Sequence, residues 1–206
     1  MPQTLAITDY IDSLAAVDAV FGLSQSPDPS FFTEWMENLP DLSVFEQQRL
    51  DVIKQRFLYH RQQGHLLEGA VNFILMSPLL ELAGFCDPPF RLRSEVSVRF
   101  EMEDERDRVY QGRIDALVVE DYLWIVLVES KRTSFNVTLA LPQALAYLSA
   151  NSQSNRPTFG LVSNGEYSIF VKLFQSQYGF SDDFSLNRRQ NDLYDVLRIL
   201  ARLKSL

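Results

Sequence analysis

The sequence predicts an α/β sandwich, in which a mixed sheet carries helices on its faces. Apolar residues recur at helical spacing up to Gly84, whereas after Asp87 they alternate with a period of two. The run from Tyr122 to Val128 is almost entirely β-branched, aromatic and leucine, which is typical of a central strand covered on both faces. Helical patterns follow this run, so strands and helices alternate in the second half of the chain.

Length and composition predict a globular protein with one main domain. The 206 residues are 46% hydrophobic and 22% charged, which is enough for one sizeable core and excludes intrinsic disorder. The single Cys86 forms no internal disulfide, and the first residues lack the pattern of a secretory leader, so we expect a cytoplasmic location. The most apolar window, Gly69 to Phe85, contains Asn72, Pro78 and Glu81 and is too short to span a membrane.

The charge distribution limits how this protein could bind nucleic acid. A net charge of −8 excludes a protein that coats nucleic acid through charge alone. Residues 1–90 hold 12 acidic and 4 basic side chains, whereas residues 91–206 hold 15 of each. A nucleic-acid site is therefore expected as a local feature of the second part, or as one that depends on bound cations to offset carboxylates.

The first half of the chain is expected to be helical. Asp41 or Ser43 is suited to cap a helix whose apolar positions recur from Val44 to Gln62. A longer apolar helix follows over Leu66 to Gly84. Pro78 should kink or divide this helix, because proline has no N–H to donate, and the glycine should end it.

Strands dominate the second half. We expect them at 92–100, 109–119, 122–128, 158–162 and 167–174. A helix with Pro142 in its first turn continues to Ala150. The turn Ser163-Asn164-Gly165 is the strongest hairpin signal, and an amphipathic helix over Leu193 to Leu206 ends the chain.

Three polar side chains stand where this pattern should bury apolar ones. Asp115 interrupts the second of these strands, and Glu129 and Lys131 end the third. If the turn centres on Asp121 and Tyr122, paired residue numbers sum to about 244, and directly opposed Cβ atoms lie about 4.5–5.5 Å apart. Asp115 then lies nearly opposite Glu129. Glu129 and Lys131 are two residues apart, so they share a face of the sheet.

This cluster has the chemistry of a divalent-cation site. Two carboxylates at this distance repel unless a proton or a metal intervenes. Mg²⁺ takes one or two protein carboxylates, keeps several waters and completes its shell with substrate phosphate oxygens. Such a site activates water and neutralises a phosphoryl transition state, while Lys131 orients the water or stabilises developing charge. The cluster therefore indicates phosphodiester hydrolysis with Mg²⁺, or with Mn²⁺ as a substitute.

The spacing of these residues resembles a known nuclease motif. Asp115, thirteen intervening residues and Glu129-Ser130-Lys131 resemble the D…ExK signature of the PD-(D/E)XK, or restriction-endonuclease-like, superfamily. Gln143 and Tyr147 resemble the QxxxY motif of the nuclease domains of type I restriction enzyme R subunits and RecB-like nucleases. The apolar helix that begins near Glu68 looks like the first core helix of the R-subunit nuclease domain.

The resemblance implies a restriction-endonuclease-like core over residues 64–206, with a mixed central sheet flanked by helices, and an extra helical cap or extension over 1–63. It also implies that Glu68 adds an auxiliary carboxylate to the catalytic metal site, and that Gln143 and Tyr147 position the substrate. The implied partners are DNA and either a second copy of the chain or the other subunits of a restriction or repair complex.

Other residues near the cluster add detail. Ile114 replaces the proline of the superfamily name, and no G-x-x-x-x-G-K-[ST] loop of a helicase motor occurs, so a nuclease module rather than a complete restriction machine is implied. Arg113 and Arg132 flank the cluster, where they would contact phosphates or form structural ion pairs.

The two histidines do not indicate a zinc site. His60 and His65 lack the spacing of zinc ligands and are assigned to the surface.

Two site residues have an alternative role. Glu68 is equally suited to be a helix N-terminal acid stabilised by the helix dipole. Gln143 and Tyr147 are suited to be an interfacial pair one turn apart.

Two alternative functions also remain open. One is a non-catalytic subunit on the same fold that binds nucleic acid or protein, because fold alone does not determine function. The other is a phosphohydrolase that acts on a small phosphorylated molecule.

Overall fold

The computed structural model describes residues 4–6, 11–93, 96–101, 109–114, 116–119, 123–127, 137–150 and 155–206. The helical elements are α2 (Leu14–Phe21), α3 (Val44–Gln62), α4 (Glu68–Val71), the π-helical turn η1 (Asn72–Met76), α5 (Ser77–Leu82), the 3-10 turn η2 (Val137–Ala140), α6 (Leu141–Ala150) and α7 (Leu193–Lys204). The strands are β1 (Thr4–Ala6), β2 (Ser24–Gln25), β3 (Leu92–Arg93), β4 (Val96–Glu101), β5 (Val109–Ile114), β6 (Ala116–Val119), β7 (Leu123–Leu127), β8 (Thr158–Ser163), β9 (Tyr167–Phe174) and β10 (Gln177–Ser185).

The described strands form two sheets. The larger sheet has the order β2-β10-β9-β8-β7-β6-β3, and the smaller has the order β1-β5-β4. In the larger sheet β7 pairs with β8 in parallel, whereas β6 with β7, β8 with β9 and β9 with β10 are antiparallel. A parallel pair needs a crossover connection, which α6 supplies. The protein is therefore mixed α/β with a mixed sheet, as the sequence predicts.

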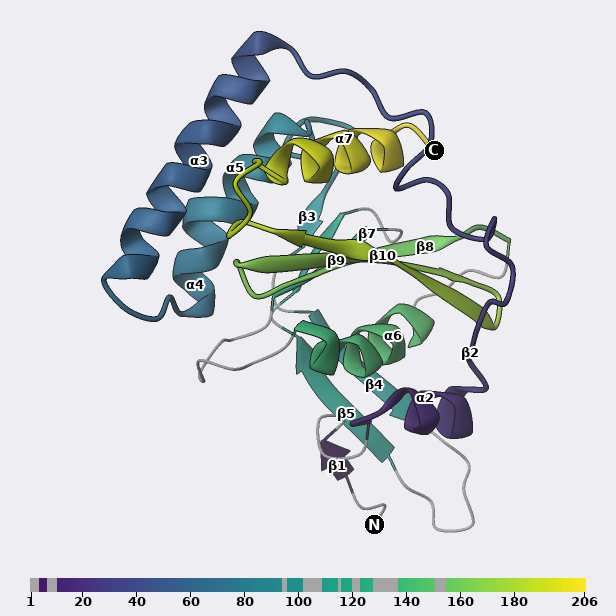
Figure 1. Cartoon of the computed structure of the whole chain (residues 1–206). Helices are drawn as coiled ribbons and strands as arrows, with labels where there is room; N and C mark the ends of the chain where they lie inside the picture. Colours follow the sequence, from purple (N-terminus) through teal and green to yellow (C-terminus); the bar gives the residue numbers. More distant parts are fainter. Residues whose placement is uncertain are drawn as a thin grey trace.

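Helices cover both faces of the larger sheet (Figure 1). Helices α3, α5 and α7 lie on one face, and α6 lies on the other, between the larger sheet and strands β4 and β5 of the smaller one. Two hydrophobic cores result. The upper core lies between the sheet and α3, α5 and α7, and the lower core lies between the sheet, α2 and α6.

Side chains of the central strands alternate between these two cores. Phe159 of β8 and Phe170 of β9 belong to the upper core, whereas Val162 and Val171 belong to the lower core. All six residues of β8 are buried. A strand covered on both faces has no solvent-facing side, so its sequence shows no alternation of apolar and polar residues.

Helix α3 spans the predicted range, and Ser43 is its cap. The Ser43 hydroxyl accepts a hydrogen bond from the Glu46 N–H at 3.2 Å, and the Glu46 carboxylate accepts one from the Ser43 N–H at 2.7 Å. This capping box satisfies backbone N–H groups that have no partner inside the helix. Leu50, Ile53 and Phe57 form the buried stripe that follows.

The second predicted helix changes from π-helical to α-helical geometry at Ser77, one residue before Pro78. Elements α4, η1 and α5 follow one another without a gap, and the Ser77 N–H donates to the carbonyl of Asn72, five residues back. Pro78 lies in the first turn of α5, where a missing N–H costs little. Gly84 follows α5 with a φ of +76°, a left-handed conformation suited to glycine, as predicted.

Three strand predictions needed correction. The prediction of one strand over 92–100 is wrong, because β3 lies in the larger sheet and β4 in the smaller one. The prediction of one strand over 109–119 is wrong for the same reason, because β5 ends at Ile114 in the smaller sheet and β6 begins at Ala116 in the larger one. Strand β10 was not predicted at all. A register shift between Phe180 and Asp183 interrupts its pairing with β9, and such a shift breaks the period of two on which a strand prediction depends.

The N-terminal part contributes to both cores. Leu50 and Phe57 pack in the upper core, Val17 and Leu23 pack in the lower core, and β2 pairs with β10. The described residues therefore do not divide into two cores at the predicted boundary between 63 and 64. None of the described helices is both long and apolar enough to cross a membrane.

Candidate functional site

Four of the predicted site residues lie outside the described part of the chain: Asp115, Glu129, Lys131 and Arg132. The strands that adjoin them in sequence are β6, which begins at Ala116, and β7, which ends at Leu127. These strands are adjacent and antiparallel, and Ala116 pairs with Val126. The start of β6 and the end of β7 therefore lie at the same end of the strand pair.

The register of β6 and β7 differs by two residues from the predicted one. Val119 pairs with Leu123, whereas the predicted register pairs it with Ile125.

Arg113 belongs to the smaller sheet. It lies in β5 and pairs with Ser97 of β4. Strands β6 and β7 belong to the larger sheet, so the chain changes sheets directly after β5.

Gln143 and Tyr147 lie one turn apart on α6. Gln143 is half-buried, whereas only 3% of Tyr147 is exposed. Tyr147 is part of the lower core, together with Val162 and Ile169. Most of the tyrosine surface therefore serves packing, and Gln143 is the member of the pair with more surface to offer a substrate.

Glu68 is half-buried and is the first residue of α4. The preceding residue, Leu67, supplies no side-chain hydrogen bond to the helix. The dipole of a helix favours negative charge in its first turn. This position therefore suits an acid that stabilises the helix. The role of Glu68 as an auxiliary metal ligand stays a prediction.

Within the described ranges, no group of three or more His, Cys, Asp or Glu side chains is arranged to hold a metal ion. His60 and His65 are exposed, as predicted. The carboxylate pair that was predicted to bind the metal lies outside these ranges.

The structure reveals a groove that was not predicted, between α3 and the segment formed by η1 and α5. One hollow, of about 550 Å³, is lined by Ser43, Phe45, Glu46, Arg49, Glu81 and Leu82. A second, of about 650 Å³, is lined by Arg56, His60, Phe73, Ile74, Ser77, Pro78, Glu81 and Cys86. Because Glu81 lines both, the two hollows adjoin, and together they are called the α3–α5 groove.

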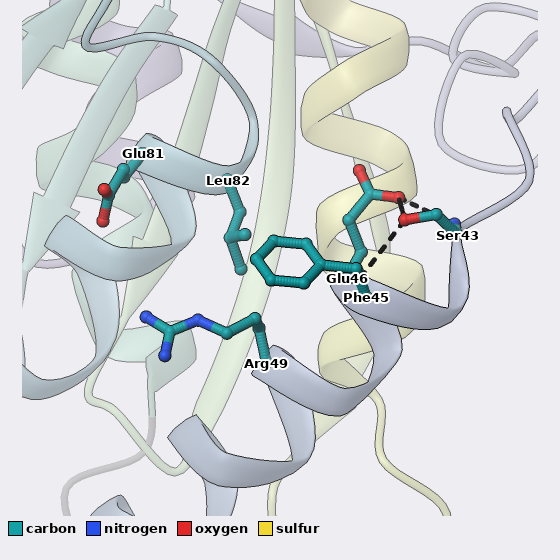
Figure 2. A pocket seen from close by; sticks show the side chains of 6 residues that line it. All are labelled: Ser43, Phe45, Glu46, Arg49, Glu81 and Leu82. Carbon is teal, nitrogen blue, oxygen red and sulfur yellow. Dashed lines mark hydrogen bonds between the residues drawn. The ribbon is translucent and has the colours of Figure 1, made fainter.

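Figure 2 shows the first hollow. The ring of Phe45 points toward Leu82 of α5, and the guanidinium of Arg49 lies on the same side as the carboxylate of Glu81. The sequence does carry a signal for the wall of the groove that α3 forms. Phe45, Arg49 and His60 fall at i, i+4 and i+15, which places them along one stripe of α3.

Two arginines of the groove have no described partner. Arg49 and Arg56 form no hydrogen bond or ion pair with any residue that the structure describes. By contrast, Lys54 donates to a carbonyl of the C-terminal part, and Arg61 pairs with Glu166. The four basic side chains of residues 1–90 thus divide into two that hold the fold and two that face the groove.

Cys86 lines the second hollow and is exposed. Partial burial raises the pKa of its thiol, and the negative charges of Glu81 and Asp87 raise this pKa further. The thiolate is the reactive form of cysteine, so this thiol is a poor nucleophile at neutral pH.

Comparisons with known proteins assign no family. No family model matches the chain, and no curated protein matches it either.

Proposed function

We propose that this protein is a metal-dependent nuclease that hydrolyses DNA phosphodiester bonds and is similar to the nuclease module of type I restriction R subunits. The observation that carries the proposal is the antiparallel pairing of β6 and β7. Strand β6 begins one residue after Asp115, and β7 ends two residues before Glu129. One carboxylate thus precedes β6 in sequence and the other follows β7, and Lys131 is two residues beyond the second. Two carboxylates and a lysine are the groups that this hydrolysis uses.

The order of the elements supports the same proposal. The helical segment α4–η1–α5 is followed by β3, β4 and β5, and then by the antiparallel pair β6 and β7, the crossover helix α6 and the parallel strand β8. We assign this series to the restriction-endonuclease-like core that the sequence resemblance implies.

The donor set fits Mg²⁺, with Mn²⁺ as a substitute, because Asp115, Glu129 and Glu68 offer only carboxylate oxygens. A bound ion of this kind supplies an activated water and neutralises charge on the phosphoryl group. Lys131 would orient the attacking water and stabilise developing negative charge as a compact cation.

The remaining site residues would position DNA. Gln143 offers a side-chain amide from α6, and Arg113 and Arg132 are suited to contact phosphates on either side of the cluster. Tyr147 would hold α6 in place from the lower core, where it is buried.

A non-catalytic subunit on the same fold is the alternative function. The observation that favours it is the net charge of −8, whose excess lies within residues 1–90. Phosphate repulsion disfavours a free-standing DNA binder with this charge. Such a subunit would bind nucleic acid or another protein without cleaving DNA.

DNA cleavage in the presence of Mg²⁺ tests the proposed nuclease. We expect Asp115→Ala and Lys131→Ala each to lower the cleavage rate by at least about a hundredfold, the effect of removing one group that stabilises transition-state charge. The thermal midpoint of Asp115→Ala should stay near that of the wild type or rise, because the substitution removes one of two like charges that repel each other in the proposed cluster. Asp182→Ala, which removes an exposed carboxylate of β10, is the matched control and should cleave normally.

Calorimetric titration with Mn²⁺ separates the two candidate functions. Binding that disappears in Asp115→Ala supports the nuclease, whereas absence of binding supports the non-catalytic subunit. Equal cleavage by the wild type and Asp115→Ala would refute the catalytic assignment.

A further inference from the structure

The α3–α5 groove has an ordered pattern of charge. Arg49 and Arg56 are seven residues apart on α3, so they lie on the same face and about 10 Å apart along the helix axis. Glu81 lines both hollows and thus lies between the two arginines along the groove. The groove therefore presents positive, negative and positive charge in that order.

Exposed aromatic side chains stand in each of the two hollows. Phe45 in the first hollow is 65% exposed, and Phe73 in the second is 80% exposed. The apolar side chains of Leu82, Ile74 and Pro78 extend this surface along the η1–α5 wall. Contiguous exposed apolar surface with polar neighbours is typical of an interaction site.

We propose that the α3–α5 groove binds an amphipathic helix of a partner protein, whose groove-facing side presents acidic, basic and acidic side chains in that order. A helix laid along α3 brings positions i, i+3 or i+4, and i+7 to one face. Positions i and i+7 match the spacing of Arg49 and Arg56 on α3, and the intermediate position would face Glu81. Apolar residues on the same face would contact Phe45 and Phe73. This interaction is independent of the proposed catalytic cluster.

Charge complementarity excludes two other occupants. A nucleic acid would bring phosphates against Glu81 and against the net negative charge of residues 1–90. A second copy of the chain lacks the matching helix, since no described helix carries acid, base and acid at this spacing. In α7, for example, Asp195, Arg198 and Arg202 give acid, base and base.

Selection from a library of displayed helical peptides tests the proposal on the full chain. Peptides of about 15 residues match the reach of the groove along α3 from Phe45 to His60. We expect the wild type to enrich peptides with acid, base and acid on the apolar face. The charge-reversed variant Arg49→Glu/Arg56→Glu should instead enrich bases at the two outer positions, and should bind the wild-type peptides at least about tenfold more weakly, or 1.4 kcal/mol.

Variants matched in chemistry locate the binding surface. Phe73→Ser should weaken the selected peptides, whereas Tyr59→Ser should not, because Tyr59 is 61% exposed on α3 but does not line the groove. Arg189→Glu reverses an exposed charge outside the groove and should leave binding unchanged. These side chains are exposed, so each variant should keep the wild-type thermal midpoint.

Cys86 provides a footprint inside the groove. A bound peptide should slow alkylation of this thiol, measured at mildly alkaline pH where the thiolate forms. Failure to enrich any peptide, or enrichment that ignores the arginine reversal and leaves alkylation unchanged, would overturn the proposal. Stronger protection of Cys86 by a single-stranded oligonucleotide, or a dimer of the chain that Phe73→Ser dissociates, would also overturn it.

Discussion

A buried ion pair between Glu34 and Lys172 joins the N-terminal part to the sheet. The Lys172 ammonium of β9 donates to the Phe31 carbonyl at 2.7 Å and to the Glu34 carboxylate at 2.5 Å. Only 13% of the Lys172 side chain and 17% of the Glu34 side chain are exposed. The ammonium also lies 5.1 Å from the centre of the Phe31 ring, so aromatic surface shields it further from water.

Breaking this ion pair should cost more than replacing it. We expect Glu34→Met and Lys172→Met each to lower the free energy of unfolding by about 3 kcal/mol, because each leaves one charge buried without its partner. The double variant should return to within about 1 kcal/mol of the wild type, since two apolar side chains then fill the site. Urea denaturation of the four proteins measures the coupling, and additive losses would contradict it.

Sequence could not predict this residue-scale contact. Glu34 and Lys172 are separated by 138 residues, and neither stands in a local pattern that specifies the other. By contrast, the Ser43 cap depends on Glu46 only three residues away, and it was one of two caps predicted. The α3–α5 groove was missed for the same reason as the ion pair, since Arg49 and Glu81 come from different helices.

At the scale of elements, the turn between β8 and β9 was predicted from local sequence, and in the structure it also packs against helix α3. The Asn164-Gly165 pair predicted the hairpin, and the Asn164 side chain accepts hydrogen bonds from two N–H groups of the turn. The turn also meets α3. A Cβ added at Gly165 would lie 2.7 Å from the ring of Phe57, which is 1% exposed.

Gly165→Ala should therefore destabilise the protein. Gly165 has a φ of +88°, so alanine would pay about 1–2 kcal/mol for a left-handed backbone and about 1–3 kcal/mol for overpacking against α3. Gly69→Ala is the matched control, because no atom lies within 4 Å of its added Cβ and alanine favours a helix by up to about 1 kcal/mol. Chemical denaturation should show a loss for the first variant and no loss for the second. Equal effects would contradict the packing argument.

The strands that were not predicted correctly from the sequence are defined by their pairing with other strands rather than by their residue composition. Strand β10 carries Asp182 and Asp183 at its register shift, so its pattern resembles a loop. The chain changes sheets after Ile114. Asp115 interrupts the pattern there, but one polar residue does not distinguish a change of sheet from a polar position within a single strand. The candidate metal cluster was inferred from a hairpin register that differs by two residues in the structure, and its role stays a prediction.

At the scale of the whole molecule, each core contains helices from both the first and the second half of the chain. Helix α3 shares the upper core with α7, and α2 shares the lower core with α6. The described residues before position 64 therefore belong to the same fold as the rest, although they lie outside the stretch that resembles a nuclease domain.

Removal of residues 1–63 should prevent folding of the remainder. The deletion takes Leu50, Ile53 and Phe57 out of the upper core, and loss of one such buried side chain already costs about 2–5 kcal/mol. We expect residues 64–206 alone to show no cooperative thermal transition by circular dichroism. A transition at the midpoint of the full chain would contradict a shared core.

The pairing of β2 with β10 also sets when the chain can fold during synthesis. The Ser26 hydroxyl donates a hydrogen bond to Gln177, 151 residues further on. Helix α3 shares its core with α7, which is translated long after it. The apolar stripe of α3 must therefore remain without its final cover while most of the polypeptide is translated. We therefore expect the native state to form only after β10 and α7 have been translated, and the nascent chain to bind holding chaperones until then.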